Sequence, residues 1–252
     1  MAQFCNGNGA FLPRSIGARG GSYVPDTTFH TIRTQKDALP VSPWKGHQLP
    51  GAIQYQLGDG HSFEFVEGTV SEEAAPEIQA LFASADQYFG YFDERSPESC
   101  LAALNNLERY IDIQGPFEGI VAFSQGGALA STLLVRYARR STAISPLKVV
   151  VFFSGGVPAD PDDLERGIVR ALDHSAVGEA IKIPTAHIWG VTERGELDWP
   201  PKLRDLCMKE TREEFQHGGG HEIPGSKDRA AVTRAVQAMR RAIWRAEIGI
   251  RE

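Results

Sequence analysis

Residues 117–127 constrain the fold of this chain more than any other stretch, and they read Phe-Glu-Gly-Ile-Val-Ala-Phe-Ser-Gln-Gly-Gly. An apolar run rich in β-formers leads to Ser124, and an alanine- and leucine-rich run that favours a helix follows at once. Ala122 and Gly126 are small, as a sharp strand-to-helix turn requires, because its backbone segments approach closely. Such a turn lifts the serine hydroxyl clear of the sheet and directs the amide of Gln125 at charge that develops beside it. The pattern predicts a serine nucleophile, and its alternative is a serine that only caps a helix.

Strand and helix patterns surround this serine. Apolar residues in β-type runs predict strands, and a Ser-Pro start with leucines at helical spacing predicts a helix from Ser96. We expect strands over residues 61–68, 147–153 and 183–190, and a closing helix over residues 228–244. Residues 71–92 are interpreted as a partly helical stretch with aromatic core or lid residues, and residues 160–178 as a charged, solvated face without chemistry. The length of 252 residues suits one α/β domain with a substantial core.

The N-terminal part differs from this pattern. Residues 1–53 are rich in glycine and proline and keep no period of 2 or 3.6 residues, which predicts an irregular segment. We therefore divide the chain into an irregular segment over residues 1–53 and an α/β domain over residues 54–252.

Composition limits the partners. The net charge is −6, and the sequence has no basic cluster, so we expect no nucleic-acid partner. No apolar run approaches the roughly 20 residues of a membrane span, and the start lacks a secretory apolar core, so we expect a cytoplasmic protein without a membrane partner. Cys5, Cys100 and Cys207 lack metal-type spacing and are expected to be reduced structural thiols.

A nucleophilic serine needs an acid and a base, and two candidate acids follow Ser124 in the sequence. Glu193 follows the strand predicted to end at Gly190, and active groups of parallel sheets gather at the carboxyl ends of strands. Asp198, five residues later, is the rival acid. His187 lies within the same strand and is expected to be a core histidine with a hydrogen-bond partner.

The candidate base lies in a glycine loop. Three glycines precede His221 and Pro224 follows it, which lets the backbone bring this side chain over the sheet edge. His217 is the alternative base. The order serine, acid, histidine is the order found in hydrolases with this kind of serine turn.

Three segments carry a family resemblance: residues 115–127 around the serine, residues 184–190, and residues 219–224 with the sequence Gly-Gly-His-Glu-Ile-Pro. Together they resemble the fungal serine hydrolases of the α/β-hydrolase superfamily. The resemblance implies an α/β-hydrolase fold, a mostly parallel central sheet with helices on both faces. It also implies thioester or ester cleavage in polyketide-type secondary metabolism, on an acyl substrate that is free or tethered to an acyl carrier protein.

By this resemblance Ser124 is the nucleophile and His221 the base, and Glu193 stands where the family usually has aspartate. The amide of Gln125 would help to hold the oxyanion, and neither a cofactor nor a metal is implied. The family opens with a buried strand and a Leu-His-Gly loop that supplies a second oxyanion amide. No clear copy occurs here, so we expect the first strand to be missing or altered, which keeps open a catalytically impaired accessory protein as the alternative function. A short-chain carboxylesterase is a further alternative.

Overall fold

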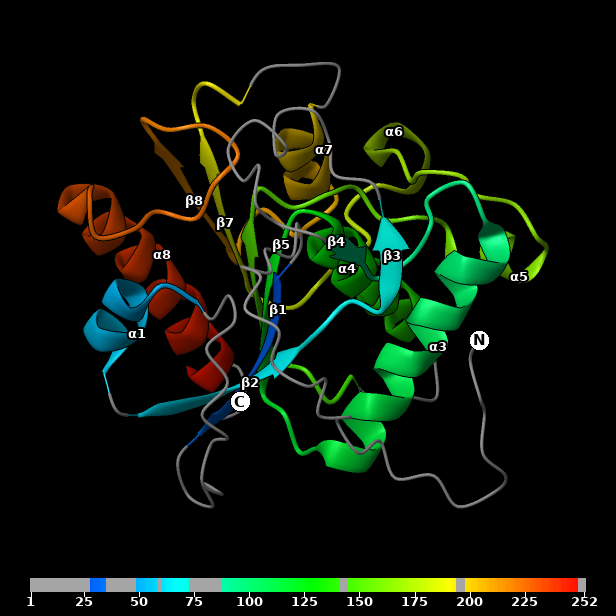
Figure 1. Cartoon of the computed structure of the whole chain (residues 1–252), viewed down its shortest axis with the longest axis horizontal. Helices are drawn as coiled ribbons and strands as arrows, with labels where there is room; N and C mark the ends of the chain where they lie inside the picture. The colour runs from blue at the N-terminus through cyan, green and yellow to red at the C-terminus, as the bar shows by residue number, and fades with distance from the viewer. Residues whose placement is uncertain are drawn as a thin grey trace.

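The computed structural model describes residues 28–34, 49–58, 60–72, 88–140, 145–193 and 198–248. A six-stranded sheet runs through the centre of this part of the chain (Figure 1). Its strands, in spatial order, are β2 (His61–Val66), β1 (Thr28–Thr34), β5 (Gly119–Phe123), β6 (Val149–Phe153), β7 (Thr185–Gly190) and β8 (Arg212–His217). Two short strands, β3 (Val70–Glu72) and β4 (Tyr88–Gly90), pair separately.

Helices cover both faces of the sheet (Figure 1). On one face lie α3 (Pro97–Gln114) and α4 (Gln125–Arg139), and on the other lie α1 (Gly51–Leu57) and α8 (Arg229–Ile248). The connections between the later strands carry α5 (Pro161–Glu165), α6 (His174–Val177) and α7 (Trp199–Asp205).

Strands β5 and β6 are buried on both faces because each supplies side chains to two cores. Ile120 and Phe152 pack with the α3 and α4 side, whereas Val121 and Phe153 pack with the α1 and α8 side. The continuous apolar runs of the sequence follow from this double burial.

The expected fold is confirmed. Strands β5 to β8 are parallel, helices lie on both faces, and the arrangement is that of an α/β hydrolase. The helix expected at Ser96 is α3, whose first turn donates the amide of Ser99 to the Ser96 hydroxyl. Cys100 and Cys207 are buried free thiols, as expected, and Cys5 lies outside the described residues.

Some expectations need correction. Residues 28–34 form β1 and residues 51–53 begin α1, so the expectation of irregular structure over residues 1–53 is wrong for these ten residues, and the boundary expected after residue 53 falls inside a helix. Residues 1–27 and 35–48 lie outside the described residues. Residues 71–72 and 88–90 lie in strands β3 and β4, so the partly helical interpretation of residues 71–92 is wrong at these positions, and residues 73–87 lie outside the described residues. Strand β8 was not expected, because its charged side chains hide the alternation that buries Phe215 and His217.

The strand beside the nucleophile strand is altered in direction. β1 pairs antiparallel with both β5 and β2, and Thr28 lies opposite Phe123 while Ile32 lies opposite Gly119. The chain therefore enters β1 beside the carboxyl end of β5, where Ser124 lies, and leaves β1 beside the amino end of β5. The C-terminal end of β1 therefore lies away from Ser124, unlike the end of the first strand expected from the family resemblance.

Candidate active site

Ser124 lies on a strained turn between β5 and α4. Its backbone has φ 52° and ψ −121°, a conformation that few residues other than glycine adopt. The Ser124 amide donates to the Phe153 carbonyl over 3.1 Å, and its own carbonyl accepts from the amide of Gly156 over 3.0 Å. These bonds fix the turn to the end of β6. A Cβ atom on Gly127 would lie 2.7 Å from Cα of Gly155, so the first turn of α4 needs a glycine there.

The imidazole of His221 connects Ser124 to a carboxylate. Nε2 of His221 lies 2.9 Å from the Ser124 hydroxyl oxygen, and Nδ1 lies 2.6 Å from Oε1 of Glu193. These two bonds join residues that are 97 and 28 positions apart in the sequence. The ring also packs against Phe123 at 4.9 Å between centroids, which fixes its tilt over the strand end.

The turn after β7 and the histidine loop are tied together by backbone bonds. Thr192 donates its amide and its hydroxyl to the Gly219 carbonyl over 3.1 Å and 2.8 Å. The Val191 amide donates to the His217 carbonyl, and the Glu193 amide to the Gly190 carbonyl. The acid and the histidine are therefore held as one unit at the carboxyl ends of β7 and β8.

The Glu193 carboxylate has a second partner. Ser154, at the end of β6, donates its hydroxyl to Oε2 over 2.8 Å. Burial alone would raise the pKa of Glu193, but the hydrogen bonds from His221 and Ser154 outweigh it and hold the pKa below its usual value. Glu193 is therefore ionised at neutral pH and suited to stabilise an imidazolium.

The alternative residues lie elsewhere. Asp198 is exposed and precedes α7 as its N-terminal cap residue. His217 is buried and accepts the Gly219 amide at Nδ1, turned toward its own loop. His187 is a core histidine, as expected: its Nε2 is 3.0 Å from the Thr185 hydroxyl and its ring stacks on Phe152.

Gln125 has separate roles for its backbone and its side chain. Its amide belongs to the first residue of α4 and so lies at the helix N-terminus, a position that favours negative charge. Its side chain accepts the Tyr91 amide over 2.8 Å and donates to the Phe92 carbonyl over 3.0 Å. The side chain thus holds the segment before α3 against the serine turn rather than pointing at a substrate.

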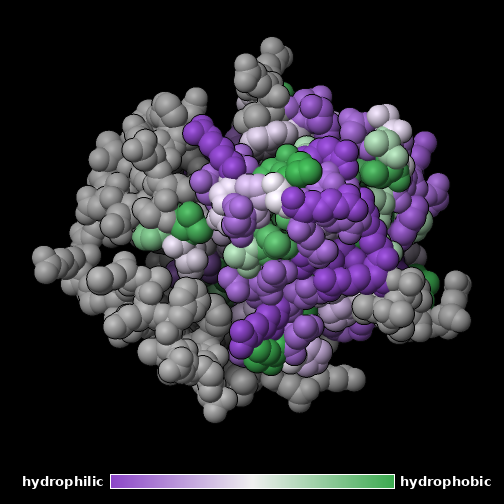
Figure 2. Space-filling view, turned by 90° about the vertical axis from the view of Figure 1, so that its right-hand side faces the viewer, coloured by the Kyte–Doolittle hydropathy of each residue, from purple (hydrophilic) through white to green (hydrophobic). Residues whose placement is uncertain are grey.

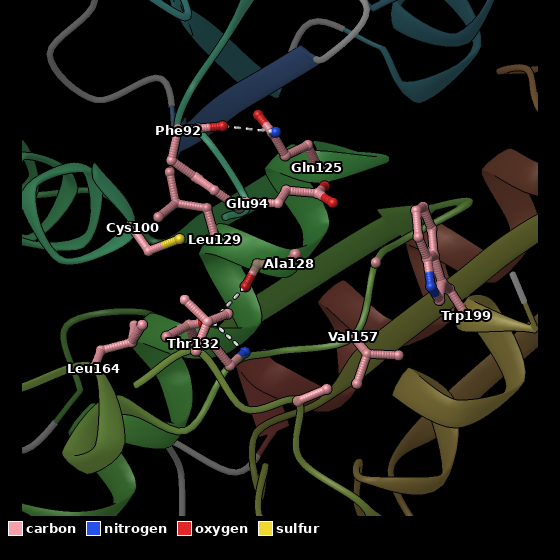
Figure 3. A pocket seen from close by; sticks show the side chains of 14 residues that line it. Phe92, Glu94, Cys100, Gln125, Ala128, Leu129, Thr132, Val157, Leu164 and Trp199 are labelled. Atoms are coloured by element: carbon pink, nitrogen blue, oxygen red, sulfur yellow. Dashed lines mark hydrogen bonds between the residues drawn. The ribbon is translucent and has the colours of Figure 1, made fainter. Parts of the chain in front are cut away.

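A cavity of about 210 Å³ begins beside the serine turn (Figure 3). It runs along one face of α4, past Gln125, Ala128, Leu129 and Thr132. The wall is completed by residues before and within α3, by the segment after β6, and by Trp199. Sequence reasoning missed this cavity because its wall comes from four separate segments.

The 160–178 segment is only partly a solvated face. Figure 2 shows a mostly hydrophilic surface on the side of α3 and α5, with hydrophobic residues in small separate groups, and Arg139 pairs there with Asp160 and Asp162. However, Leu164 is buried and lines the cavity together with Val169, so the expectation of a solvated face does not hold for every residue of this segment. Within the described residues, none of the helices combines the length and the apolar character that crossing a membrane needs.

Comparison with known proteins agrees with a serine hydrolase. Residues 47–232 match the family described as "Serine hydrolase (FSH1)", and the chain belongs to this serine hydrolase family. More particularly, it is 35% identical over 176 residues to "Esterase FPY3" of Fusarium mangiferae, covering 69% of this chain and 79% of that protein. It is 30% identical over 195 residues to "Hydrolase phiM" of a fungal species, covering 75% of this chain and 81% of the relative. Among solved structures, Arabidopsis thaliana SOBER1 aligns with a TM-score of 0.38 and 23% identity over 60% of this chain and 67% of that one.

Proposed function

We propose that this serine hydrolase cleaves an ester or thioester bond of an acyl substrate through Ser124, His221 and Glu193. The observation that carries the proposal is the continuous row of hydrogen bonds from the Ser124 hydroxyl through His221 to Glu193. Nucleophile, base and orienting acid within hydrogen-bond reach are the geometric requirement for this class of catalysis.

Each residue has a defined step. Nε2 of His221 accepts the Ser124 proton as the hydroxyl oxygen attacks the acyl carbonyl, and Glu193 stabilises the resulting imidazolium. The amide of Gln125 donates to the oxyanion. His221 then donates the proton to the leaving oxygen or sulfur, and an acyl-enzyme ester remains on Ser124. Water, deprotonated by His221, releases the acid and restores the serine.

The substrate class is proposed on two grounds. The names of the two relatives describe an esterase and a hydrolase, which favours an acyl ester. The family resemblance favours release or trimming of a polyketide-type product in fungal secondary metabolism, with the acyl group as a thioester on a carrier protein.

The test is covalent labelling by a fluorophosphonate probe, which reacts only with an activated serine. We expect labelling of the native chain at Ser124, none in Ser124→Ala, and turnover of acyl thioesters and p-nitrophenyl esters only by the native chain. Labelling of Ser124 together with turnover of short esters but not of acyl thioesters or longer esters would favour a short-chain carboxylesterase.

A catalytically impaired accessory protein is the second candidate, and the direction of β1 favours it. Because β1 runs antiparallel to β5, its C-terminal end lies away from Ser124, whereas the family resemblance implies a donor loop after this strand and beside the serine. A folded native chain that resists the probe would support this candidate and contradict the hydrolase proposal.

A further inference from the structure

The cavity next to the serine turn offers a mostly apolar site close to the reacting group. Gln125 is adjacent to Ser124, and Gly156, another wall residue, donates its amide to the Ser124 carbonyl. From Gln125 to Thr132 the wall follows seven residues of α4, or about 10 Å at 1.5 Å per residue. The cavity wall therefore extends along α4 away from the residue that follows Ser124.

The far end of the cavity presents methyl groups. The Thr132 hydroxyl donates to the Ala128 carbonyl over 2.7 Å and accepts the Ala159 amide over 3.1 Å. Its polar atom is thus used inside the protein, and Leu164 and Ala159 add only hydrocarbon. At the mouth, Glu94 adds a carboxylate, which disfavours a chain that carries a second negative charge.

The position of His221 decides which half of the substrate enters. The leaving group must reach Nε2 of His221, which enters the site from the loop after β8. The cavity wall consists mainly of residues from the α3, α4 and α5 side (Figures 1 and 3). An acyl chain bound in the cavity would lie on that side, with the leaving alcohol or thiol on the side of the histidine.

We propose that this cavity binds the acyl chain of the substrate and selects a neutral, unbranched apolar chain of medium length. A carbon–carbon bond spans about 1.5 Å, so the roughly 10 Å of wall along α4 from Gln125 to Thr132 accommodates a chain of about six to eight carbons. This inference rests on the proposed function and adds the chain length and its limit at Ala159 and Leu164.

The experiment compares kcat/KM for p-nitrophenyl esters from acetyl to dodecanoyl. In the native chain kcat/KM increases about fourfold per added methylene up to hexanoyl or octanoyl, because each buried methylene adds a constant increment of binding free energy. For longer chains kcat/KM falls. Ala159→Leu fills the far end and moves the optimum about two to three carbons shorter. Leu164→Ala opens it and moves the optimum longer.

The matched control is Ala102→Leu, the same change on the exposed face of α3, which leaves the profile as in the native chain. Unchanged profiles in both cavity variants, with esters still cleaved, would overturn the acyl site and leave the proposed function standing. Absence of both cleavage and fluorophosphonate labelling would instead contradict the proposed function.

A second observation concerns Ser154 and is independent of the cavity. Ser154 is 1% exposed and has φ 44°, a left-handed conformation that is strained for a residue with a side chain. In this conformation its hydroxyl donates to Oε2 of Glu193 over 2.8 Å, while Oε1 faces His221. Both carboxylate oxygens are thus held, which compensates for the additional rotatable bond of glutamate relative to aspartate.

We infer that Ser154 is a positioning residue that fixes the Glu193 carboxylate for His221. Ser154→Ala keeps the backbone but removes the hydroxyl and lowers kcat about tenfold at unchanged KM. Glu193→Asp shortens the side chain by one carbon–carbon bond, about 1.5 Å, so its carboxylate does not reach both partners. In the Glu193→Asp background, Ser154→Ala therefore costs less than about twofold.

Ser154→Gly distinguishes the effect of the hydroxyl from that of the backbone conformation. It removes the hydroxyl, and glycine adopts this φ without strain. It should lose as much kcat as Ser154→Ala. Native activity in Ser154→Gly would overturn the inference. An equal loss from Ser154→Ala in both backgrounds would assign a structural role instead.

Discussion

Gly190 at the end of β7 contacts the Gly219 carbonyl so closely that a Cβ atom on Gly190 would overlap it. The two backbone segments are also held together, because the Thr192 amide and hydroxyl both donate to the same Gly219 carbonyl. The position of His221, two residues after Gly219, therefore depends on the absence of a side chain at Gly190.

We predict that Gly190→Ala lowers kcat about 10²-fold, since a displacement of about 1 Å at a reacting group has an effect of this size. The loop moves outward and lengthens the bond between His221 and Ser124. Gly218→Ala is the control, because a Cβ atom on Gly218 meets nothing within 4 Å. Steady-state kinetics with circular dichroism measures both, and equal activity of the two variants would contradict the prediction.

His221→Ala should reduce kcat about 10⁶-fold, as loss of the base does in a triad that acts as one unit. His217→Ala should leave kcat near the native value while reducing stability, because His217 is buried and lies outside the hydrogen-bonded row. Kinetics below the unfolding temperature separates the two effects. A comparable loss of kcat at His217 would reverse the assignment of the base.

Glu193→Gln should reduce kcat about 10⁴-fold with little change in KM, because the amide is similar in size but does not stabilise the imidazolium. Asp198→Asn, on the exposed residue before α7, should behave like the native chain. Both are measured as kcat on one ester. If Asp198→Asn is the damaging change, Asp198 is the acid.

His187 should make stability depend on pH. Burial, followed by the charges of Arg212 and Arg204, lowers its pKa from 6.5 to about 3. The unfolded chain therefore binds a proton below pH 6.5 that the folded chain does not bind until about pH 3. The free energy of unfolding should decrease as pH falls through this window, by up to about 1.4 kcal/mol per pH unit.

Urea unfolding between neutral pH and pH 4 tests this dependence. In His187→Gln the free energy of unfolding should depend less steeply on pH than in the native chain. His174→Gln, at an exposed position, should keep the pH dependence of the native chain. Equal slopes for the native chain and His187→Gln would rule out His187 as the source.

Local sequence predicts the parts of this molecule that depend on contiguous residues. The serine turn was predictable because small residues must flank Ser124, and α3 because Ser96 and Pro97 form a helix start. The direction of β1 was not predictable, because it depends on pairing with β5, a strand about ninety residues away.

The supporting residues of the site were also hidden. Ser154 reads as an ordinary residue in a Ser-Gly-Gly loop, and only the left-handed backbone and the approach of Glu193 distinguish it. A polar residue at the end of the strand next to the nucleophile strand was the available signal. The sequence left both Glu193 and Asp198 as candidate acids, because the distance from a carboxylate to His221 depends on the fold.

The pairing of β7 with β8 has a consequence for chain length. Gly190 lies opposite His217, so the turn that carries Glu193 and the loop that carries His221 start from the same level. A strand residue advances the chain by about 3.3 Å and reverses the face of the next side chain. A one-residue deletion within β8 would therefore separate the acid from the histidine while every side chain of the candidate triad is retained. Insertions before β8, in the connection from α7, keep the alignment and the site, so variation in length among related chains should concentrate there.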